Sequence, residues 1–120
     1  MKLLIVDDST MLRDMLSYAL NEGGYNDVTE AVDGIDGLEK SKSNEFDLVI
    51  TDVNMPNMDG ISLIRELRKL PDYKFIPILM LTTESGSEKK QEGRSAGATG
   101  WIVKPFNPEQ LLATIKKVLG

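Results

Sequence analysis

The sequence predicts a doubly wound α/β domain, in which a parallel β-sheet lies between two layers of helices. The chain has 120 residues, 41% of them hydrophobic, which suits one compact core better than two small ones. Short apolar runs alternate strictly with longer segments of helical periodicity, and this alternation is typical of doubly wound folds. The apolar runs are continuous rather than alternating, which indicates strands that are covered on both faces.

Five strands and five helices are expected. The apolar runs that predict the strands are Leu3–Val6, Val28–Val32, Leu48–Ile50, Ile76–Leu81 and Trp101–Val103. Helical spacing of apolar residues predicts helices over residues 11–20, 35–39, 61–68 and 111–119. The first should stop at Gly23-Gly24, and the last should begin at Asn107, a good N-terminal cap that Pro108 follows.

The remaining helix, over residues 88–95, has an unusual composition. It contains no large apolar residue, and Gly93 lies inside it. A helix that is polar on all sides is poorly anchored, and a glycine lowers helix stability by about 1 kcal/mol relative to alanine. We therefore expect this helix to be short and mobile.

Composition excludes several classes of function. The chain has no cysteine and no histidine, which removes disulfides, thiol catalysis, Ser-His-Asp catalysis and zinc sites built on these residues. The net charge of −5 disfavours binding to nucleic-acid backbones. The apolar runs are too short to span a membrane, and the N-terminal one stops at Asp7-Asp8, too early for a signal peptide. A cytoplasmic location is expected.

Polar residues follow four of the five predicted strands. Asp7 and Asp8 follow the first strand, Asp52 the third, Thr82 the fourth and Lys104 the fifth. In an open parallel sheet these positions meet at one edge, where such folds bind their ligands. Each residue alone could be a cap, a turn, a strand end or a solvated charge. Their joint occurrence predicts a functional site.

The residue types at this edge indicate a particular chemistry. Three crowded carboxylates repel one another unless a cation joins them, and Mg²⁺ binds one or two carboxylates together with phosphate oxygens. One aspartate then remains free to form an acyl phosphate. The Lys104 ammonium and the Thr82 hydroxyl could neutralise the other phosphoryl oxygens.

These residues resemble the motifs of the response-regulator receiver domain, and closely those of its single-domain chemotaxis type, CheY. The resemblance covers essentially the whole chain. The motifs are Val6-Asp7-Asp8-Ser9, Asp52-Val53-Asn54-Met55-Pro56, Thr82-Thr83-Glu84 and Lys104-Pro105-Phe106. The resemblance implies a flavodoxin-like sheet of strand order 2-1-3-4-5, and a single receiver domain over residues 1–120 without an output domain.

The resemblance also implies a role for each site residue. Asp52 would be the phosphoacceptor, Lys104 would pair with the phosphoryl group, and Thr82 would move toward it while Trp101 follows. Asp7, Asp8, Asp52 and the backbone carbonyl of Asn54 would hold Mg²⁺. Asn54 and Glu84 would tune hydrolysis, and the Lys104-Pro105 bond would be cis. Two departures from the family pattern are Trp101, where tyrosine or phenylalanine is usual, and the polar fourth helix.

The function implied is a phosphorylation-activated switch, with no enzymatic activity beyond self-catalysed phosphotransfer and dephosphorylation. A histidine kinase would supply phosphate to the monomer, the flagellar motor switch would be the target, and a phosphatase would be a further partner. The alternative is a phosphorelay intermediate that passes phosphate to a histidine phosphotransfer domain. A flavodoxin-like carrier is disfavoured because Asp7-Asp8 would repel a flavin phosphate. An aspartyl-nucleophile phosphatase would carry Asp-x-Asp in place of Asp7-Asp8-Ser9.

Overall fold

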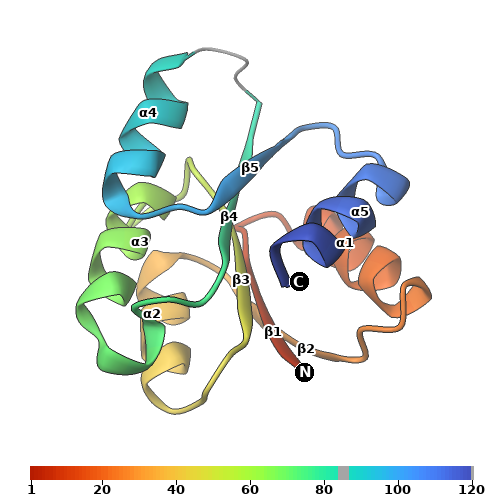
Figure 1. The fold of residues 1–120 in the computed structure, drawn as a ribbon, viewed down its shortest axis with the longest axis horizontal. Helices are drawn as coiled ribbons and strands as arrows, with labels where there is room; N and C mark the ends of the chain where they lie inside the picture. Colours follow the sequence, from red (N-terminus) through yellow and green to blue (C-terminus); the bar gives the residue numbers. More distant parts are fainter. Residues whose placement is uncertain (84–86, 120) are drawn as a thin grey trace.

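The structure, a computed structural model that describes residues 1–83 and 87–119, has three layers. Five parallel strands form one sheet in the order β2-β1-β3-β4-β5, as the resemblance implied. In chain order the elements are β1 Lys2–Val6, α1 Thr10–Glu22, β2 Asp27–Ala31, α2 Gly34–Lys42, β3 Leu48–Asp52, α3 Gly60–Lys69, the 3₁₀ helix η1 Pro71–Tyr73, β4 Ile78–Thr82, α4 Ser87–Ala96, β5 Gly100–Val103 and α5 Pro108–Leu119. Helices α2, α3 and α4 cover one face, and α1 and α5 cover the other (Figure 1).

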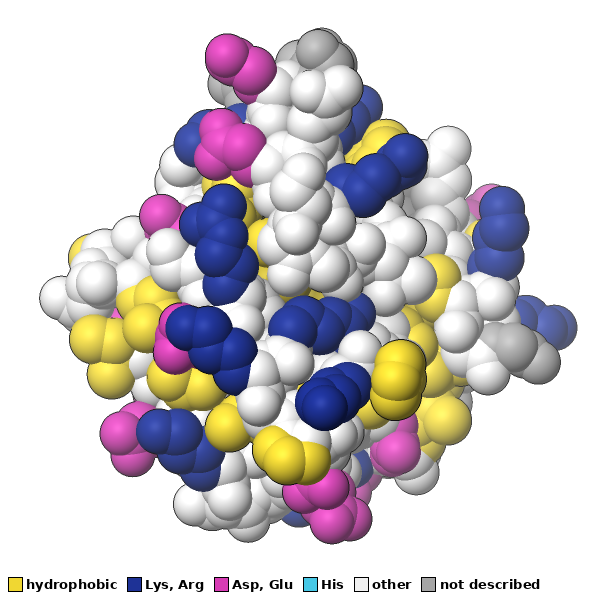
Figure 2. All heavy atoms as spheres, turned by 60° about the vertical axis from the view of Figure 1, so that its left-hand side comes forward, with side chains coloured by type: hydrophobic (Ala, Val, Ile, Leu, Met, Phe, Trp, Pro, Cys, Tyr) yellow, Lys and Arg dark blue, Asp and Glu magenta, His cyan; other side chains and the backbone are white. Residues whose placement is uncertain are grey.

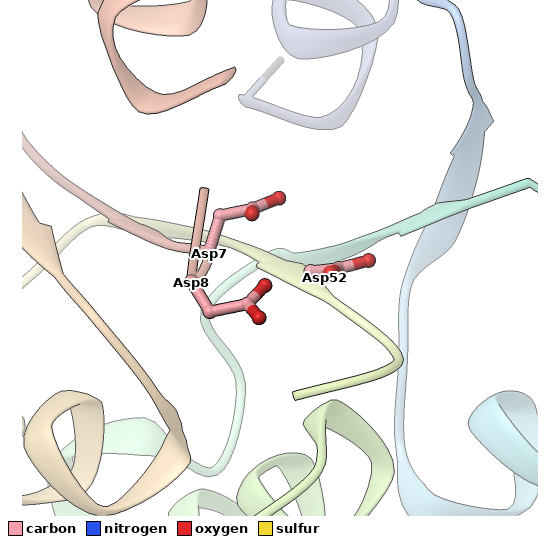
Figure 3. Close-up of side chains that lie close together, drawn as sticks. All are labelled: Asp7, Asp8 and Asp52. Carbon is pink, nitrogen blue, oxygen red and sulfur yellow. The ribbon is translucent and has the colours of Figure 1, made fainter. Parts of the chain in front are cut away.

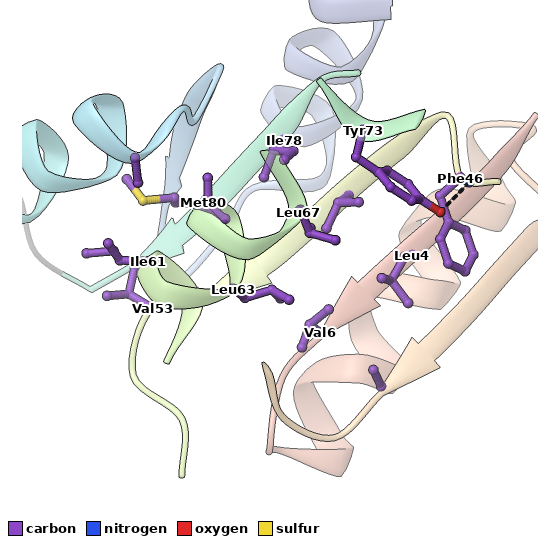
Figure 4. Packing of buried hydrophobic residues seen from close by; sticks show 14 residues of the cluster. Leu4, Val6, Phe46, Val53, Ile61, Leu63, Leu67, Tyr73, Ile78 and Met80 are labelled. Carbon is purple, nitrogen blue, oxygen red and sulfur yellow. Dashed lines mark hydrogen bonds between the residues drawn. The ribbon is translucent and has the colours of Figure 1, made fainter. Parts of the chain in front are cut away.

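Each face of the sheet has its own apolar core. Leu4 and Val6 of β1 belong to the cluster on the α3 side, whereas Leu3 and Ile5 belong to the cluster on the α1 and α5 side. Figure 4 shows the α3-side cluster, in which Tyr73 is buried and its hydroxyl accepts a hydrogen bond from the Phe46 amide at 3.3 Å. Because successive residues enter opposite cores, the residues of a central strand are apolar until its carboxyl end, which explains the continuous runs.

Polar caps begin the helices at the edge where the strands end. Ser9, Asp33 and Asp59 accept backbone hydrogen bonds at the N-termini of α1, α2 and α3. Asn107 Oδ1 accepts from the amides of Glu109 and Gln110 at 2.9 and 3.2 Å, which confirms the predicted cap of α5. The caps fix the turns that carry the site residues.

Helix α4 contains the helix that we expected over residues 88–95. It has 10 residues, the same number as α3. A Cβ atom at Gly93 would lie 2.2 Å from Met80 Sδ, so the glycine allows α4 to approach β4 closely. Arg68 also donates from Nε and Nη2 to the Gly97 carbonyl, at 3.0 and 2.7 Å, at the end of the helix. The expected helix is therefore present and extends one residue further at each end, and Gly93 within it is a packing residue; the mobility of α4 stays a prediction.

Within residues 1–83 and 87–119, no helix combines the length and the apolar character that a membrane crossing needs.

Candidate functional site

Three carboxylates meet at the carboxyl ends of β1 and β3 (Figure 3). Asp7 follows β1 and is 1% exposed, Asp8 next to it is exposed, and Asp52 ends β3 with 7% exposure. One carboxylate oxygen from each residue lies within 4.8 Å of the others. The structure thus brings together the three aspartates that the sequence placed at one edge, in a cluster that combines two buried groups with one that solvent can reach.

Lys104 directly follows β5, the strand at one edge of the sheet, and its side chain reaches this cluster. Its Nζ lies 2.9 Å from Asp52 Oδ1 and 3.4 Å from Asp7 Oδ2, and its side chain is only 18% exposed. The Lys104-Pro105 peptide bond is cis, as expected. One ammonium therefore bridges two aspartates that are 45 residues apart in the chain, and it offsets part of their repulsion.

The two oxygens of Asp52 differ in their surroundings. Oδ1 accepts hydrogen bonds from Lys104 Nζ and from the Val53 amide, both at 2.9 Å. Across residues 1–83 and 87–119, every hydrogen bond to this carboxylate falls on Oδ1. Two donors thus fix the orientation of the group, and Oδ2 is left as the oxygen that can act as a nucleophile.

The charge of Asp7 is opposed by its burial and by a neighbouring carboxylate. Burial raises the pKa of Asp7 above its usual value, and the neighbouring Asp52 charge adds to the increase. The Ser9 amide, which donates to Asp7 Oδ1 at 2.8 Å, and the Lys104 ammonium lower the pKa and so oppose this shift. The net increase shows that Lys104 alone does not compensate for the buried negative charge, so the site favours an additional cation.

Arg13 supports the acidic turn, and the sequence analysis missed it. Its Nη1 donates to the Asp7 carbonyl at 2.6 Å, and its Nε pairs with Glu30 Oε1 at 3.0 Å. The only signal in the sequence is that Arg13 lies one helical turn after Ser9, which places it near the same edge of the sheet.

The remaining predicted residues surround the aspartates. Thr82 ends β4 and is 3% exposed, aligned with Val103 of β5. Asn54 is exposed in the segment after Asp52. Glu84 lies outside the described residues, so its predicted role in hydrolysis has no structural counterpart here.

Trp101 lies against α4. It is half-buried and pairs with Met80 across β5 and β4. Two cations cover its ring, with Lys90 Nζ 4.9 Å and Arg94 Cζ 5.6 Å from the centroid, a favourable arrangement over an aromatic face. Figure 2 shows Lys and Arg side chains spread over this side of the molecule.

Gly60 supports Asp52 through its lack of a side chain. A Cβ atom at this position would lie 1.9 Å from the Asp52 carbonyl oxygen. Gly60→Ala is therefore expected to lower the free energy of unfolding by about 3 kcal/mol, at the upper end of overpacking effects. Urea unfolding measures the loss. Gly100→Ala is the control, because its Cβ would meet Leu79 at an ordinary 3.5 Å; equal stability of the two variants would contradict the prediction.

The fold and this acidic edge define a phosphorylatable signalling domain, and the comparisons with known proteins agree. The chain belongs to the family of response regulator receiver domains, whose model matches residues 3–116. It is 42% identical to the chemotaxis protein CheY1 of Helicobacter pylori over 121 residues, which cover 100% of this chain and 98% of the relative.

Two solved structures extend the comparison. The chemotaxis response regulator CheY4 of Vibrio cholerae is 53% identical, with a TM-score of 0.93 over 98% of this chain and 97% of that one. A receiver domain of a Pseudomonas aeruginosa sensor histidine kinase is 26% identical, with a TM-score of 0.92 over 99% and 97% of the two chains. That structure holds a magnesium ion in its active site cleft.

Proposed function

We propose that this protein is the phosphorylation-activated switch of a two-component system that controls chemotaxis, with Asp52 as the phosphoacceptor. The observation that carries the proposal is the environment of Asp52: Oδ1 is held by Lys104 and the Val53 amide, and Asp7 and Asp8 lie within reach. Family membership favours this function over an electron carrier or a phosphatase. The similarity to CheY1 and CheY4 favours chemotaxis.

The donor set fits Mg²⁺. Asp7, Asp8 and Asp52 offer carboxylate oxygens within 4.8 Å of one another, and such hard oxygen ligands suit this ion. The raised pKa of Asp7 indicates that the site lacks compensating positive charge. We assign these three residues and the Asn54 carbonyl to the metal. When bound, Mg²⁺ would neutralise charge on the phosphoryl oxygens.

The chemistry follows from the two oxygens of Asp52. Oδ2 attacks the phosphorus of a phosphohistidine on the kinase, the phosphorus–nitrogen bond breaks, and the leaving imidazole takes up a proton. Lys104 then pairs with a phosphoryl oxygen, and the Thr82 hydroxyl donates to another. Asn54 and Glu84 would tune how fast water hydrolyses the acyl phosphate. The protein is thus an active participant in its own phosphorylation and dephosphorylation.

The target surface is the face formed by α4, β5 and α5. Trp101 and its covering cations lie on this face, and the strand next to it carries Thr82. When Thr82 moves toward the phosphoryl group, the indole can turn inward and α4 can shift. The target would be a component of the flagellar motor switch, and the protein would act as a monomeric messenger in the cytoplasm.

Two measurements test the function. The protein is incubated with acetyl phosphate and Mg²⁺, and its intact mass is recorded. The phosphorylated and unphosphorylated forms are then compared for binding to a motor-switch peptide and for phosphoryl transfer to a histidine phosphotransfer domain. Phosphorylation-dependent peptide binding supports the switch, whereas transfer without such binding would establish the alternative, a relay intermediate.

Removal of the lysine charge should affect signalling more than folding. Lys104→Ala is expected to weaken target binding by the phosphorylated protein by about 1.5–3 kcal/mol, the usual contribution of a charge-assisted hydrogen bond. Fluorescence anisotropy with a labelled target peptide measures the loss. Lys42→Ala, which removes an exposed lysine of α2, outside the target surface, is the matched control. Wild-type affinity in phosphorylated Lys104→Ala would show that the lysine is dispensable.

Trp101 should report the switch directly, because it is the only tryptophan. Its emission is expected to shift when beryllofluoride, a phosphoryl mimic, is added with Mg²⁺, since the ring would leave the Lys90 and Arg94 cations. Thr82→Ala should reduce the shift. If emission, quencher access and amide exchange of α4 are all identical with and without the mimic, this switch does not operate in the protein.

A further inference from the structure

The segment that follows Asp52 is held by a contact from a different part of the chain. Asn57 Nδ2 donates to Asp33 Oδ2 at 2.7 Å, and Asp33 Oδ1 accepts from the Asp36 amide at 2.8 Å. These two hydrogen bonds lower the pKa of Asp33 below its usual value. Asp33 thus uses one oxygen to cap α2 and the other to hold the loop of residues 53–59.

The backbone at Asn57 needs such support. Asn57 has a φ of +68°, and it is the one non-glycine residue with a positive φ in the described part of the chain. The Met58 amide donates to the Pro56 carbonyl at 2.7 Å, which closes a three-residue γ-turn around Asn57. This turn type is rare and strained for a residue with a side chain. A strained backbone persists only where its surroundings hold it in place, and such positions concentrate at functional sites.

The β2–α2 turn supplies a second contact to the same γ-turn. The Gly34 amide donates to the Met58 carbonyl at 3.2 Å. A Cβ atom at Gly34 would lie 2.4 Å from that oxygen, so the two segments approach as closely as a glycine permits. The γ-turn is therefore held through the Asn57 side chain and through the Met58 backbone.

The loop that carries this turn also carries the site. Its two ends are fixed to each other, because the Gly60 amide donates to the Val53 carbonyl at 2.9 Å. The Val53 amide in turn donates to Asp52 Oδ1. Asn54 lies between the fixed end at Val53 and the strained turn at Asn57, so both features hold the segment that carries its carbonyl.

We propose that Asp33 and Asn57 are a positioning pair for the metal site: their hydrogen bond maintains the γ-turn and thereby holds the Asn54 carbonyl toward Asp7, Asp8 and Asp52. Neither residue touches the ion or the phosphoryl group. The inference rests on the proposed function, because it concerns the Mg²⁺ site assigned there. It predicts that loss of this hydrogen bond weakens Mg²⁺ binding while the fold remains.

Two variants remove the hydrogen bond and retain the other role of each residue. Asp33→Ser keeps an effective cap for α2, but its shorter side chain does not reach Asn57. Asn57→Gly places a residue that adopts positive φ easily, but glycine lacks the side-chain amide that donates to Asp33. Calorimetric titration with Mg²⁺ is expected to give about tenfold weaker binding in each variant, the usual effect of losing an outer-shell partner.

The double variant and a conservative variant separate positioning from general destabilisation. Because both single variants break the same contact, Asp33→Ser combined with Asn57→Gly should bind Mg²⁺ no more weakly than either alone. Asp33→Asn should restore near wild-type affinity, since its oxygen can cap α2 and its amide can donate to a reoriented Asn57 side chain. Asn107→Ser, which shortens the cap residue of α5, is the matched control and should leave Mg²⁺ binding unchanged.

The outcomes are distinguishable. Thermal unfolding without Mg²⁺ reports the stability of each variant independently of metal binding. If the wild-type protein binds Mg²⁺ and both single variants bind it with the same affinity, whatever their stability, the pair is only structural and the inference is overturned. Additive losses in the double variant would also contradict it. If the wild-type protein binds no Mg²⁺, the assigned metal site itself fails, and the inference fails with it.

Discussion

Asp52→Asn is expected to abolish phosphorylation completely and to leave the fold intact. Asparagine has the shape of aspartate, and its Oδ1 can still accept from Lys104 Nζ and the Val53 amide, which both lie 2.9 Å from Asp52 Oδ1. The oxygen that would attack phosphorus is replaced by an amide nitrogen, which is not nucleophilic and forms no acyl phosphate. Intact-mass spectrometry after incubation with acetyl phosphate and Mg²⁺ measures the effect.

A second aspartate serves as the control for this substitution. Asp59 caps α3 by accepting from the Ser62 amide at 2.7 Å, and asparagine is an equally good cap. Asp59→Asn should therefore show the wild-type mass increase. An undiminished mass increase in Asp52→Asn would place the phosphoryl group on another residue and overturn the assignment. Thermal unfolding should be nearly unchanged in both variants.

The architecture could be predicted from the sequence because burial determines the pattern of the strands. Each central strand lies between two cores, so its apolar run is continuous and is easily recognised. The boundaries were less accurate where backbone hydrogen bonding decides them. The fourth strand was expected from Ile76, but β4 begins at Ile78, directly after Pro77, which has no amide to donate.

The packing role of Gly93 in α4 was missed for a local reason. Gly93 was interpreted through its helix propensity, which describes an isolated helix. In the folded protein its missing side chain allows close contact with Met80, and Ala96 beside it is 8% exposed. Tertiary packing thus outweighs propensity here, and a sequence does not reveal which neighbour a glycine will meet.

The aspartates and Lys104 could be predicted because topology alone places strand ends together. The residues that support them could not. Asp33 and Asn57 are 24 residues apart and Arg13 and Glu30 are 17 apart. Each of these pairs depends on the exact path of two loops or on the packing of a helix against a strand. In the sequence such residues look like ordinary caps, turns and surface charges.

Removal of Mg²⁺ is expected to abolish phosphorylation, and the cause should be visible in stability as well. Within residues 1–83 and 87–119, the Lys104 ammonium is the one cation paired with the carboxylates of Asp7 and Asp52, Asp8 adds a third negative charge, and the incoming phosphoryl group would add more. Chelation by EDTA should therefore prevent the mass increase with acetyl phosphate, and added Mg²⁺ should restore it. Mg²⁺ at a hundred times its Kd should also raise the free energy of unfolding by about 2.7 kcal/mol.

The pH dependence of stability also tests the cost of the negative charge at Asp7, because a proton on Asp7 removes the charge that Mg²⁺ would otherwise compensate. Burial, together with the Asp52 charge, raises the pKa of Asp7 in the folded protein. The metal-free fold thus binds a proton at Asp7 more tightly than the unfolded chain does. That contribution is complete below the unfolded pKa and is lost as pH rises through the raised folded value. Mg²⁺ requires ionised Asp7, so its stabilising effect should be largest near neutral pH and decrease in acid.

Asp7→Asn distinguishes the effect of bound Mg²⁺ on stability from the effect of the buried negative charge. Without Mg²⁺ it should unfold at a higher temperature than the wild type near neutral pH, because the buried charge is gone. With Mg²⁺ it should show little of the wild-type stabilisation and no phosphorylation. Asp14→Asn, at an exposed position of α1, is the control and should follow the wild type. If chelated wild-type protein accepts phosphate at the full rate, or if Asp7→Asn is stabilised by Mg²⁺ as strongly as the wild type, then these carboxylates do not form the metal site.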